Sequence, residues 1–316
     1  MKYPAIEPFE SGFLRTSDGA DLYWERSGNP FGIPALWLHG GPGGSLGTGG
    51  YRRHFDPDRY LLIGIDQRGS GRSRPLIIDA RGTLPEHTTA RLIEDIELVR
   101  AMLNIQQWVV AGVSWGTTLA LAYALTYPNR VRALALVAVT TTSRTEVDWI
   151  TEDVGRVFPE EWNEFRESAH QRPGERIVDA YARRLATSEH NDREAAALAW
   201  DSWEGVHISL DNRNAHRAVH EDPIKRQVFA TLVTHYWSND GFLTGDRAIL
   251  GRIDQIAHVP AALIHGRRDI SGPAVTAWQL HKRWPASTLT IIEDEAHGGV
   301  QEMLRLADAL DTFAEL

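Results

Sequence analysis

The hydrophobic pattern of the chain consists of short, continuous apolar runs separated by longer amphipathic stretches. The runs occupy residues 35–38, 61–65, 108–111, 133–137, 261–264 and 289–292. Strands that are buried on both faces read as continuous apolar runs, so these segments are predicted to be the strands of a parallel sheet. Residues 13–16 and 22–25 flank a turn signal at Asp18 and Gly19, which predicts an opening hairpin.

Helices are predicted between these strands. In one such stretch four apolar residues recur at helical spacing, namely Leu92, Ile96, Val99 and Leu103. Thr88 and Thr89 precede the stretch and are candidates for its N-cap. Strands that alternate with helices predict an α/β fold, in which helices cover both faces of a mostly parallel, doubly wound sheet.

The composition and the hydrophobic pattern change over residues 141–256, which are charged, rich in tryptophan and without a strand-like run. An insertion at this point, after one strand and before the next, would lie over the C-terminal edge of the sheet, where α/β proteins bind ligands. We therefore predict a core domain from residues 1–140 and 257–316 and a helical cap domain from residues 141–256. A separate helical domain is the alternative, but no linker rich in Pro, Gly or Ser marks the ends of the segment.

Composition narrows the classes of partner. The 316 residues carry a formal net charge of -9 and no block rich in Lys or Arg, which argues against binding to nucleic acid or to an anionic membrane surface. The absence of Cys excludes disulfides and a thiolate nucleophile, and it fits a reducing cytoplasm. Residues 1–8 lack the apolar region of a signal peptide, and no run reaches the roughly 18 apolar residues of a membrane span. We expect a cytoplasmic protein that acts on small, neutral or cationic molecules.

The strongest chemical signal is a G-x-S-x-G pattern at residues 112–116. It follows the predicted strand at 108–111 and precedes the helix-like residues 117–123. In this setting the glycines leave room for a sharp turn between strand and helix, and the turn places the serine at a helix N-terminus. Ser114 is therefore the candidate nucleophile.

A serine hydroxyl needs a base, and the base needs an acid that orients it. In hydrolases with this type of turn, the acid and then the histidine follow the serine along the chain, each in a loop after a late strand. Asp269 follows the strand at 261–264, and His297 follows the strand at 289–292. These positions predict a triad of Ser114, Asp269 and His297. The neighbouring residues that remain as alternatives are Asp294, Glu295 and His265.

The oxyanion of an acyl-transfer reaction needs fixed N–H donors. One is expected from Trp115, directly after the nucleophile. The other is expected from the glycine-rich loop at residues 39–44 after the strand at 35–38, with Gly41 as the candidate. A structural role is expected for His39 in the same loop.

Five motifs together resemble the proline iminopeptidases, also called prolyl aminopeptidases (peptidase family S33), of the α/β-hydrolase fold. They lie at residues 39–43 (HGGPG), 66–73 (DQRGSGRS), 112–116 (GVSWG), 265–269 (HGRRD) and 296–298 (AHG). The resemblance covers nearly the whole chain. It implies an α/β-hydrolase that removes an N-terminal residue, typically proline, through an acyl-enzyme and without a metal or cofactor. It also implies that Asp66 and Arg68 brace loops.

An aminopeptidase must recognise a cationic α-amine, for which a buried carboxylate is the physical means. The segment Trp200-Asp201-Ser202-Trp203-Glu204 resembles a W-x-x-W-E segment of the family cap. The resemblance makes Glu204 the candidate that binds the amine, and makes Trp200 and Trp203 candidate walls for a pyrrolidine ring. The alternative is that the tryptophans pack inside the cap and that Glu204 is solvated.

Two segments depart from the family pattern. Val233 stands where the family usually has a second amine-binding Glu, and residues 140–142 (TTT) replace a segment that usually resembles Arg-Gly-Ile. Both changes bear on the charge of the amine pocket and leave the triad intact. Asp240 or Asp201 is a candidate to replace the missing carboxylate, although an exposed charge on the cap is the expected role of each.

The sequence therefore predicts a serine hydrolase that releases an N-terminal proline or another small amino acid from a peptide or amide. An amino-acid amidase or esterase with a remodelled cap, including one that serves a biosynthetic pathway, is the alternative enzyme. Epoxide hydrolases and dehalogenases of this fold use an Asp where this chain has Ser114. A ligand receptor without catalytic activity is disfavoured because the triad is complete.

Overall fold

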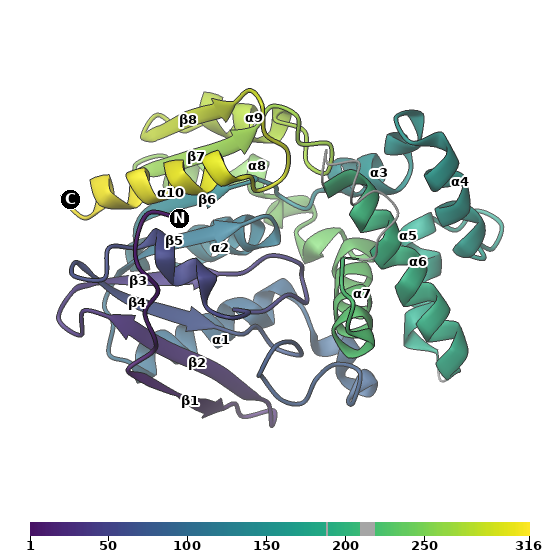
Figure 1. Cartoon of the computed structure of the whole chain (residues 1–316), viewed down its shortest axis with the longest axis horizontal. Coiled ribbons are helices and arrows are strands. Elements are labelled where there is room, and N and C mark those ends of the chain that lie inside the picture. Colours follow the sequence, from purple (N-terminus) through teal and green to yellow (C-terminus); the bar gives the residue numbers. More distant parts are fainter. Residues whose placement is uncertain (188, 209–218) are drawn as a thin grey trace.

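The computed structural model describes residues 1–187, 189–208 and 219–316. At its centre lies a twisted sheet of eight strands in the order β1-β2-β4-β3-β5-β6-β7-β8 (Figure 1). The strands are β1 (Glu10–Arg15), β2 (Asp21–Gly28), β3 (Ile33–Leu38), β4 (Tyr60–Ile65), β5 (Trp108–Val113), β6 (Val131–Val137), β7 (Ala261–Gly266) and β8 (Ser287–Ile292). β1 and β2 form the predicted hairpin at one edge, and β2 also pairs antiparallel with β4. The other neighbouring strands, in the order β4-β3-β5-β6-β7-β8, pair parallel.

Alternate residues of the central strands enter two different hydrophobic clusters. In β3, Leu36 and Leu38 pack with α1, α2 and α9 on one face, whereas Ala35 and Trp37 pack with α10 on the other. The helices are α1 (Thr89–Met102), α2 (Trp115–Thr126), α9 (Val275–Arg283) and α10 (Val300–Phe313). Burial on both faces explains why the strands read as continuous apolar runs. The predicted N-cap is also present, since the Thr88 hydroxyl accepts a hydrogen bond from the Arg91 N–H at 3.2 Å.

Of the helices that the described residues form between β6 and β7, five extend beyond one end of the sheet (Figure 1). They are α3 (Arg144–Thr151), α4 (Pro159–Ser168), α5 (Ile177–Ala186), α6 (His190–Ile208) and α7 (Pro223–Ser238). We call them the cap helices. All five contribute to a hydrophobic cluster of their own, which is built around Phe165, Tyr181, Trp200 and Trp203.

Helix α7 joins the cap helices to the sheet. Its residues Phe229 and Val233 pack into the cap cluster. Leu232 and Tyr236 pack into the cluster that α1, α2 and α9 form with one face of the sheet, which we call the cluster beneath the sheet. The rings of Tyr236 and Trp115 lie 4.8 Å apart between centroids. The cap helices are thus held directly above the turn that carries Ser114.

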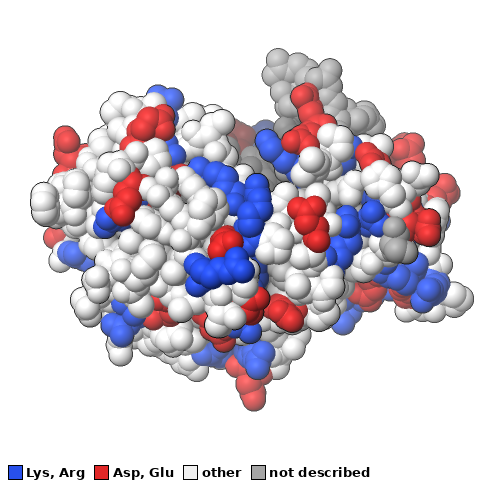
Figure 2. Space-filling model, turned by 90° about the horizontal axis from the view of Figure 1, so that it is seen from below, with Lys and Arg blue, Asp and Glu red and all other residues white. Residues whose placement is uncertain are grey.

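The predicted α/β-hydrolase fold, with a mostly parallel sheet and covering helices, is confirmed. The division into core and cap at residues 140 and 257 stays a prediction. Ile249 of α8 (Ile249–Arg252) and Ile253 already pack in the cluster beneath the sheet, before that second boundary. No helix in the described ranges is long and apolar enough to cross a membrane. Figure 2 shows acidic and basic side chains interspersed over one face of the molecule.

Candidate active site

Ser114 occupies a tight turn between β5 and α2. Its φ of 55° and ψ of -126° lie in a region that costs a residue other than glycine about 1–3 kcal/mol. The surrounding backbone holds this conformation, because the Ser114 N–H donates to the Val137 carbonyl at 3.0 Å and the Ser114 carbonyl accepts from Thr117 N–H at 2.7 Å. The turn leaves the serine side chain at the N-terminal end of α2, facing a cavity.

The glycines of the turn are required by close approach of the backbone. A Cβ at Gly116 would lie 2.2 Å from the Leu38 carbonyl oxygen, and one at Gly112 would lie 2.5 Å from the Gly116 carbonyl oxygen. Both neighbours are backbone atoms, one at the end of β3 and the other in α2, so they cannot move aside without disturbing these elements. This contact explains the spacing of the G-x-S-x-G pattern.

Gly116→Ala is expected to lower the free energy of unfolding by about 2 kcal/mol or more, because the new methyl group overlaps the β3 backbone. Denaturant unfolding would measure the change. Gly251→Ala in α8 is the matched control, since no atom lies within 4 Å of its Cβ position. That variant should be at least as stable as the original protein. Equal stability of the two variants would contradict the packing argument.

Asp269 and His297 lie side by side in the loops after β7 and β8. The Nδ1 of His297 is 2.8 Å from Oδ2 of Asp269, while Oδ1 of Asp269 accepts a hydrogen bond from the Gly272 N–H at 2.8 Å. Burial lowers the pKa of His297, but the charge of Asp269 and the hydrogen bond to it outweigh burial, so the pKa lies above its ordinary value. Burial acts in the opposite sense on Asp269, and the partner histidine holds its pKa below the usual range.

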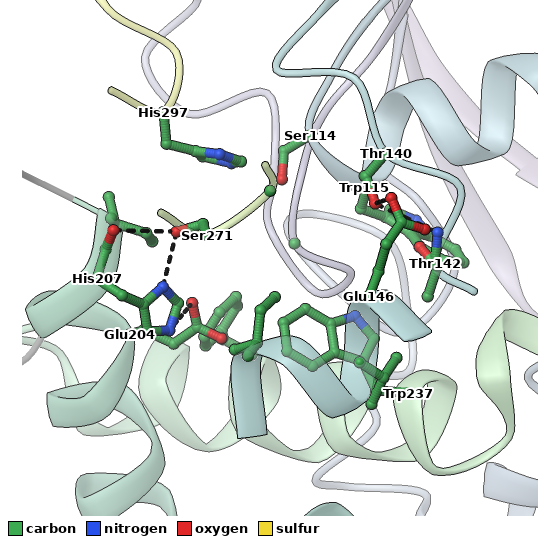
Figure 3. A pocket seen from close by; sticks show the side chains of 16 residues that line it. Ser114, Trp115, Thr140, Thr142, Glu146, Glu204, His207, Trp237, Ser271 and His297 are labelled. Atoms are coloured by element: carbon green, nitrogen blue, oxygen red, sulfur yellow. Dashed lines mark hydrogen bonds and ion pairs between the residues drawn. The ribbon is translucent and has the colours of Figure 1, made fainter. Parts of the chain in front are cut away.

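Ser114 and His297 line the same cavity, and Figure 3 shows the ring of His297 turned toward the serine. Because Nδ1 of His297 is engaged by Asp269, Nε2 is the nitrogen left for the serine proton. The structure therefore brings together the three residues of the predicted triad. These are the residue types and the order of contacts that a nucleophile, a base and an orienting acid require.

The predicted oxyanion donors also border the cavity. Gly41 and Trp115 both line it, and within the described ranges neither backbone N–H donates a hydrogen bond. Gly41 has a φ of 120°, and a Cβ there would lie 2.7 Å from the backbone nitrogens of Gly43 and Gly44. Only glycine fits at position 41. The backbone N–H groups of Gly41 and Trp115 remain available to donate to an oxyanion.

The alternatives to the triad have other contacts. His265 is fully buried, where its Nδ1 accepts from the Val139 N–H at 3.0 Å and its Nε2 donates to the Gly272 carbonyl at 2.5 Å. The Glu295 carboxylate accepts from two N–H groups at the start of α10. Asp294 is exposed and pairs with Arg268. His265 and Glu295 therefore stabilise the loops around the site.

The loop residues expected to be structural are likewise engaged. Asp66 accepts the Leu46 N–H at 2.6 Å and pairs with Arg72 at 2.7 Å. Arg68 donates two hydrogen bonds to the Asp95 carboxylate, at 2.9 and 2.7 Å. Arg68 thus joins the loop after β4 to α1. The same loop is joined to the glycine-rich loop by His39, which accepts the Gln67 N–H at 3.0 Å.

The cavity beside Ser114 has a volume of about 220 Å³, which is small beside the roughly 300–1,000 Å³ of pockets for drug-sized ligands. Its apolar walls come from the cap helices and comprise Val147, Ile150, Ile208, Phe229 and Trp237. Glu204 also lines it and is 4 % exposed. Burial raises the pKa of Glu204 to about 8, and the nearby Asp201 carboxylate adds to the effect.

The structure places four residues of the predicted cap away from the cavity. Trp200 and Trp203 lie outside the lining of the cavity and pack within the cap cluster, although the Trp200 Nε1–H does donate to Glu204 Oε1 at 3.1 Å. The indole that lines the cavity is Trp237. Asp201 and Asp240 are buried rather than exposed, and each is paired away from the cavity: Asp201 with His220, and Asp240 with Arg144 and Arg176.

Other lining residues escaped the sequence reasoning. His207 lies one helical turn after Glu204, so helical spacing alone could have indicated it. Glu146 follows Ser143 by three residues in a capping box at the start of α3. Its carboxylate accepts hydrogen bonds from four hydroxyl groups, those of Thr140, Thr141, Ser143 and Thr276. Residues 140–142, which replace the segment usual in the family, are therefore held by the Glu146 carboxylate.

The fold and the site define the class of protein: the chain is a serine hydrolase of the α/β-hydrolase fold, and residues 34–300 match the family described by that fold. The proline iminopeptidase of Arabidopsis thaliana is 40% identical over 299 residues, which cover 93% of this chain and 77% of that protein. The proline iminopeptidase of Xylella fastidiosa (strain Temecula1) is 38% identical over 314 residues, covering 98% of each. The chain belongs to the proline iminopeptidase family.

A solved structure supports the same fold. The proline iminopeptidase of Mycobacterium smegmatis superposes with a TM-score of 0.60 at 18% identity, over 97% of this chain and 99% of that one. At this identity the likeness concerns the fold alone. The family assignment rests on the sequence relatives.

Proposed function

We propose that this serine hydrolase removes an N-terminal proline, or another small amino acid, from a peptide or amide. The observation that carries the proposal is the position of Glu204, a buried carboxylate in the same small cavity as Ser114. An acyl group whose carbonyl lies at the serine would place its α-amine within this cavity. The small volume favours a single residue on the amine side of the bond, as in an aminopeptidase. The names of the sequence relatives point to the same activity.

In the proposed mechanism, His297 Nε2 takes the proton of Ser114 as the serine oxygen attacks the carbonyl carbon. The N–H groups of Gly41 and Trp115 stabilise the oxyanion, and Asp269 stabilises the imidazolium. His297 then gives its proton to the leaving amine, and the C–N bond breaks. Water attacks the acyl-enzyme by the same route and releases the amino acid.

Described residues of the predicted cap, among them Val147, Glu204 and Trp237, line this cavity, which supports the two-domain organisation that we propose for the chain. The absence of cysteine suits a reducing cytoplasm, where we place the enzyme. An amidase or esterase remains the second candidate, because Val233 leaves Glu204 without the second carboxylate usual in the family.

The test compares proline p-nitroanilide with cyclopentanecarboxylic acid p-nitroanilide, in which a methylene replaces the amine. We expect kcat/KM to favour the prolyl substrate by about 10²-fold or more, because a site built to bind an N–H group rejects the analogue that lacks it. Glu204→Gln should reduce this preference by about 10²-fold, mainly through KM, since the substrate cation would lose its charged partner.

Glu194→Gln is the matched control on the same helix. The Glu194 side chain is 42% exposed, and we expect its replacement to leave the preference unchanged. A wild-type enzyme that hydrolyses both anilides equally well would reject the aminopeptidase in favour of the amidase or esterase.

A further inference from the structure

His207 presents an unpartnered, buried nitrogen to the cavity beside Glu204. The Ser271 hydroxyl donates its single proton to the His207 carbonyl at 3.2 Å, and its oxygen lies 2.7 Å from His207 Nδ1. That oxygen must accept from Nδ1–H, so the hydrogen bonds assign the proton of the ring to Nδ1 and a lone pair to Nε2. Within the described residues Nε2 has no hydrogen-bond partner, although the side chain is only 1% exposed.

Glu204 offers a second acceptor at the same place. Its Oε1 accepts from the Trp200 Nε1–H, whereas its Oε2 lies 3.7 Å from His207 Nε2. This separation is too long for a hydrogen bond between them. It is short enough for one donor group placed between the two atoms to reach both. Figure 3 shows the two side chains together on the α6 side of the cavity, opposite Ser114 and His297.

Burial, more than the surrounding charges, keeps the ring of His207 neutral. Burial lowers the pKa of His207 to about 3. The nearby His297 also lowers this pKa, whereas the charge of Asp269 raises it. On its own helix, Asp201 is turned to His220 and Arg226. The Nε2 lone pair is therefore available over the whole working range of pH. A buried lone pair without a donor is costly unless a ligand supplies one.

We propose that Glu204 Oε2 and His207 Nε2 together hold the protonated α-amine of the substrate, each accepting one of its N–H groups. The inference rests on the aminopeptidase function proposed above. The secondary ammonium of an N-terminal proline carries two N–H bonds, which match two acceptors. When the ammonium binds, its charge favours the ionised form of Glu204, whose pKa burial raises to about 8 in the empty site. The carboxylate and the neutral imidazole then balance a single positive charge, so His207 supplies the acceptor that Val233 does not.

The test measures the ratio of kcat/KM for the prolyl anilide to that for the cyclopentanecarboxyl anilide in two variants. In His207→Asn the amide can still donate to Ser271 but has no atom at the Nε2 position, whereas in His207→Gln the longer side chain brings its oxygen there. We expect the ratio to fall about tenfold or more in the Asn variant, because a charge-assisted hydrogen bond is lost. The Gln variant should recover part of this loss.

Ser271→Ala tests the assignment of the ring proton. It removes the oxygen that holds the proton on Nδ1 of His207, so the ring can carry its proton on Nε2, and the ratio should fall in the same direction as in the Asn variant. If His207→Asn does not fold, His207→Gln and Ser271→Ala still carry the comparison. A ratio unchanged in the Asn variant, or equal loss on both substrates in both His207 variants, would overturn the role of His207 while wild-type selectivity keeps the aminopeptidase. Absence of selectivity in the wild type would overturn both.

Discussion

Ser114→Ala is expected to lower kcat by about 10⁴-fold or more, with Tm changed by less than about 2 °C. The hydroxyl makes none of the hydrogen bonds that hold the turn, which come from the Ser114 backbone. Alanine can therefore occupy the same turn, but no oxygen remains to form the acyl-enzyme. Steady-state hydrolysis of proline p-nitroanilide and of p-nitrophenyl acetate, together with thermal unfolding, would measure both effects.

Labelling with a fluorophosphonate provides an independent readout. The wild-type enzyme should be labelled once, at Ser114, and the Ala variant should not react. Ser45→Ala is a suitable control, because Ser45 is an exposed serine that directly follows the glycine-rich loop. Turnover retained by Ser114→Ala would reject this residue as nucleophile, and a wild type that neither reacts nor turns over substrate would favour a receptor.

The sheet could be predicted because its strands are buried on both faces. The run at residues 108–111 lies within β5, and its alternate residues Val109 and Val110 face different clusters. Strands that are buried on both faces have continuous runs of apolar residues, and such runs can be recognised in the sequence. The positions of Ser114, Asp269 and His297 follow from the same strands, since each residue lies just beyond the C-terminal end of one of them.

The substrate side of the site was harder to predict, because it depends on how the cap helices pack. Trp200 and Glu204 lie one turn apart on α6, and no local pattern says which of them reaches the cavity. Asp201 and Asp240 are charged, which suggests exposure. Their partners lie between 19 and 96 residues away in sequence, so their burial follows from tertiary contacts alone.

The resemblance to a family predicted some of the residues that line the cavity but not others. It indicated Glu204, which does line the cavity, and it indicated two tryptophans that do not. A motif records residue types at a spacing, whereas the wall of a pocket depends on the neighbouring helix. In this chain that neighbour is α7, which contributes Phe229 and Trp237.

Asp269→Asn is expected to lower kcat/KM by about 10⁴-fold through the wrong tautomer of His297. The Oδ1 of the new side chain can still accept from the Gly272 N–H, as Asp269 does at 2.8 Å. Its NH₂ group is then directed at His297 Nδ1 and donates to it. The ring must carry its proton on Nε2, which faces Ser114 and can no longer accept the serine proton.

The pH profile should move with this change. In the wild type, burial lowers the pKa of His297, but the charge and hydrogen bond of Asp269 raise it above the ordinary value. Since the base must be neutral, activity falls as pH drops through that raised pKa. The neutral amide of Asn removes both effects, so the acid limb of kcat/KM should shift to lower pH while the plateau falls. Asp294→Asn, an exposed carboxylate in the loop of His297, should leave plateau and limb in place; an Asp269→Asn profile that keeps the wild-type limb would reject Asp269 as the partner of His297.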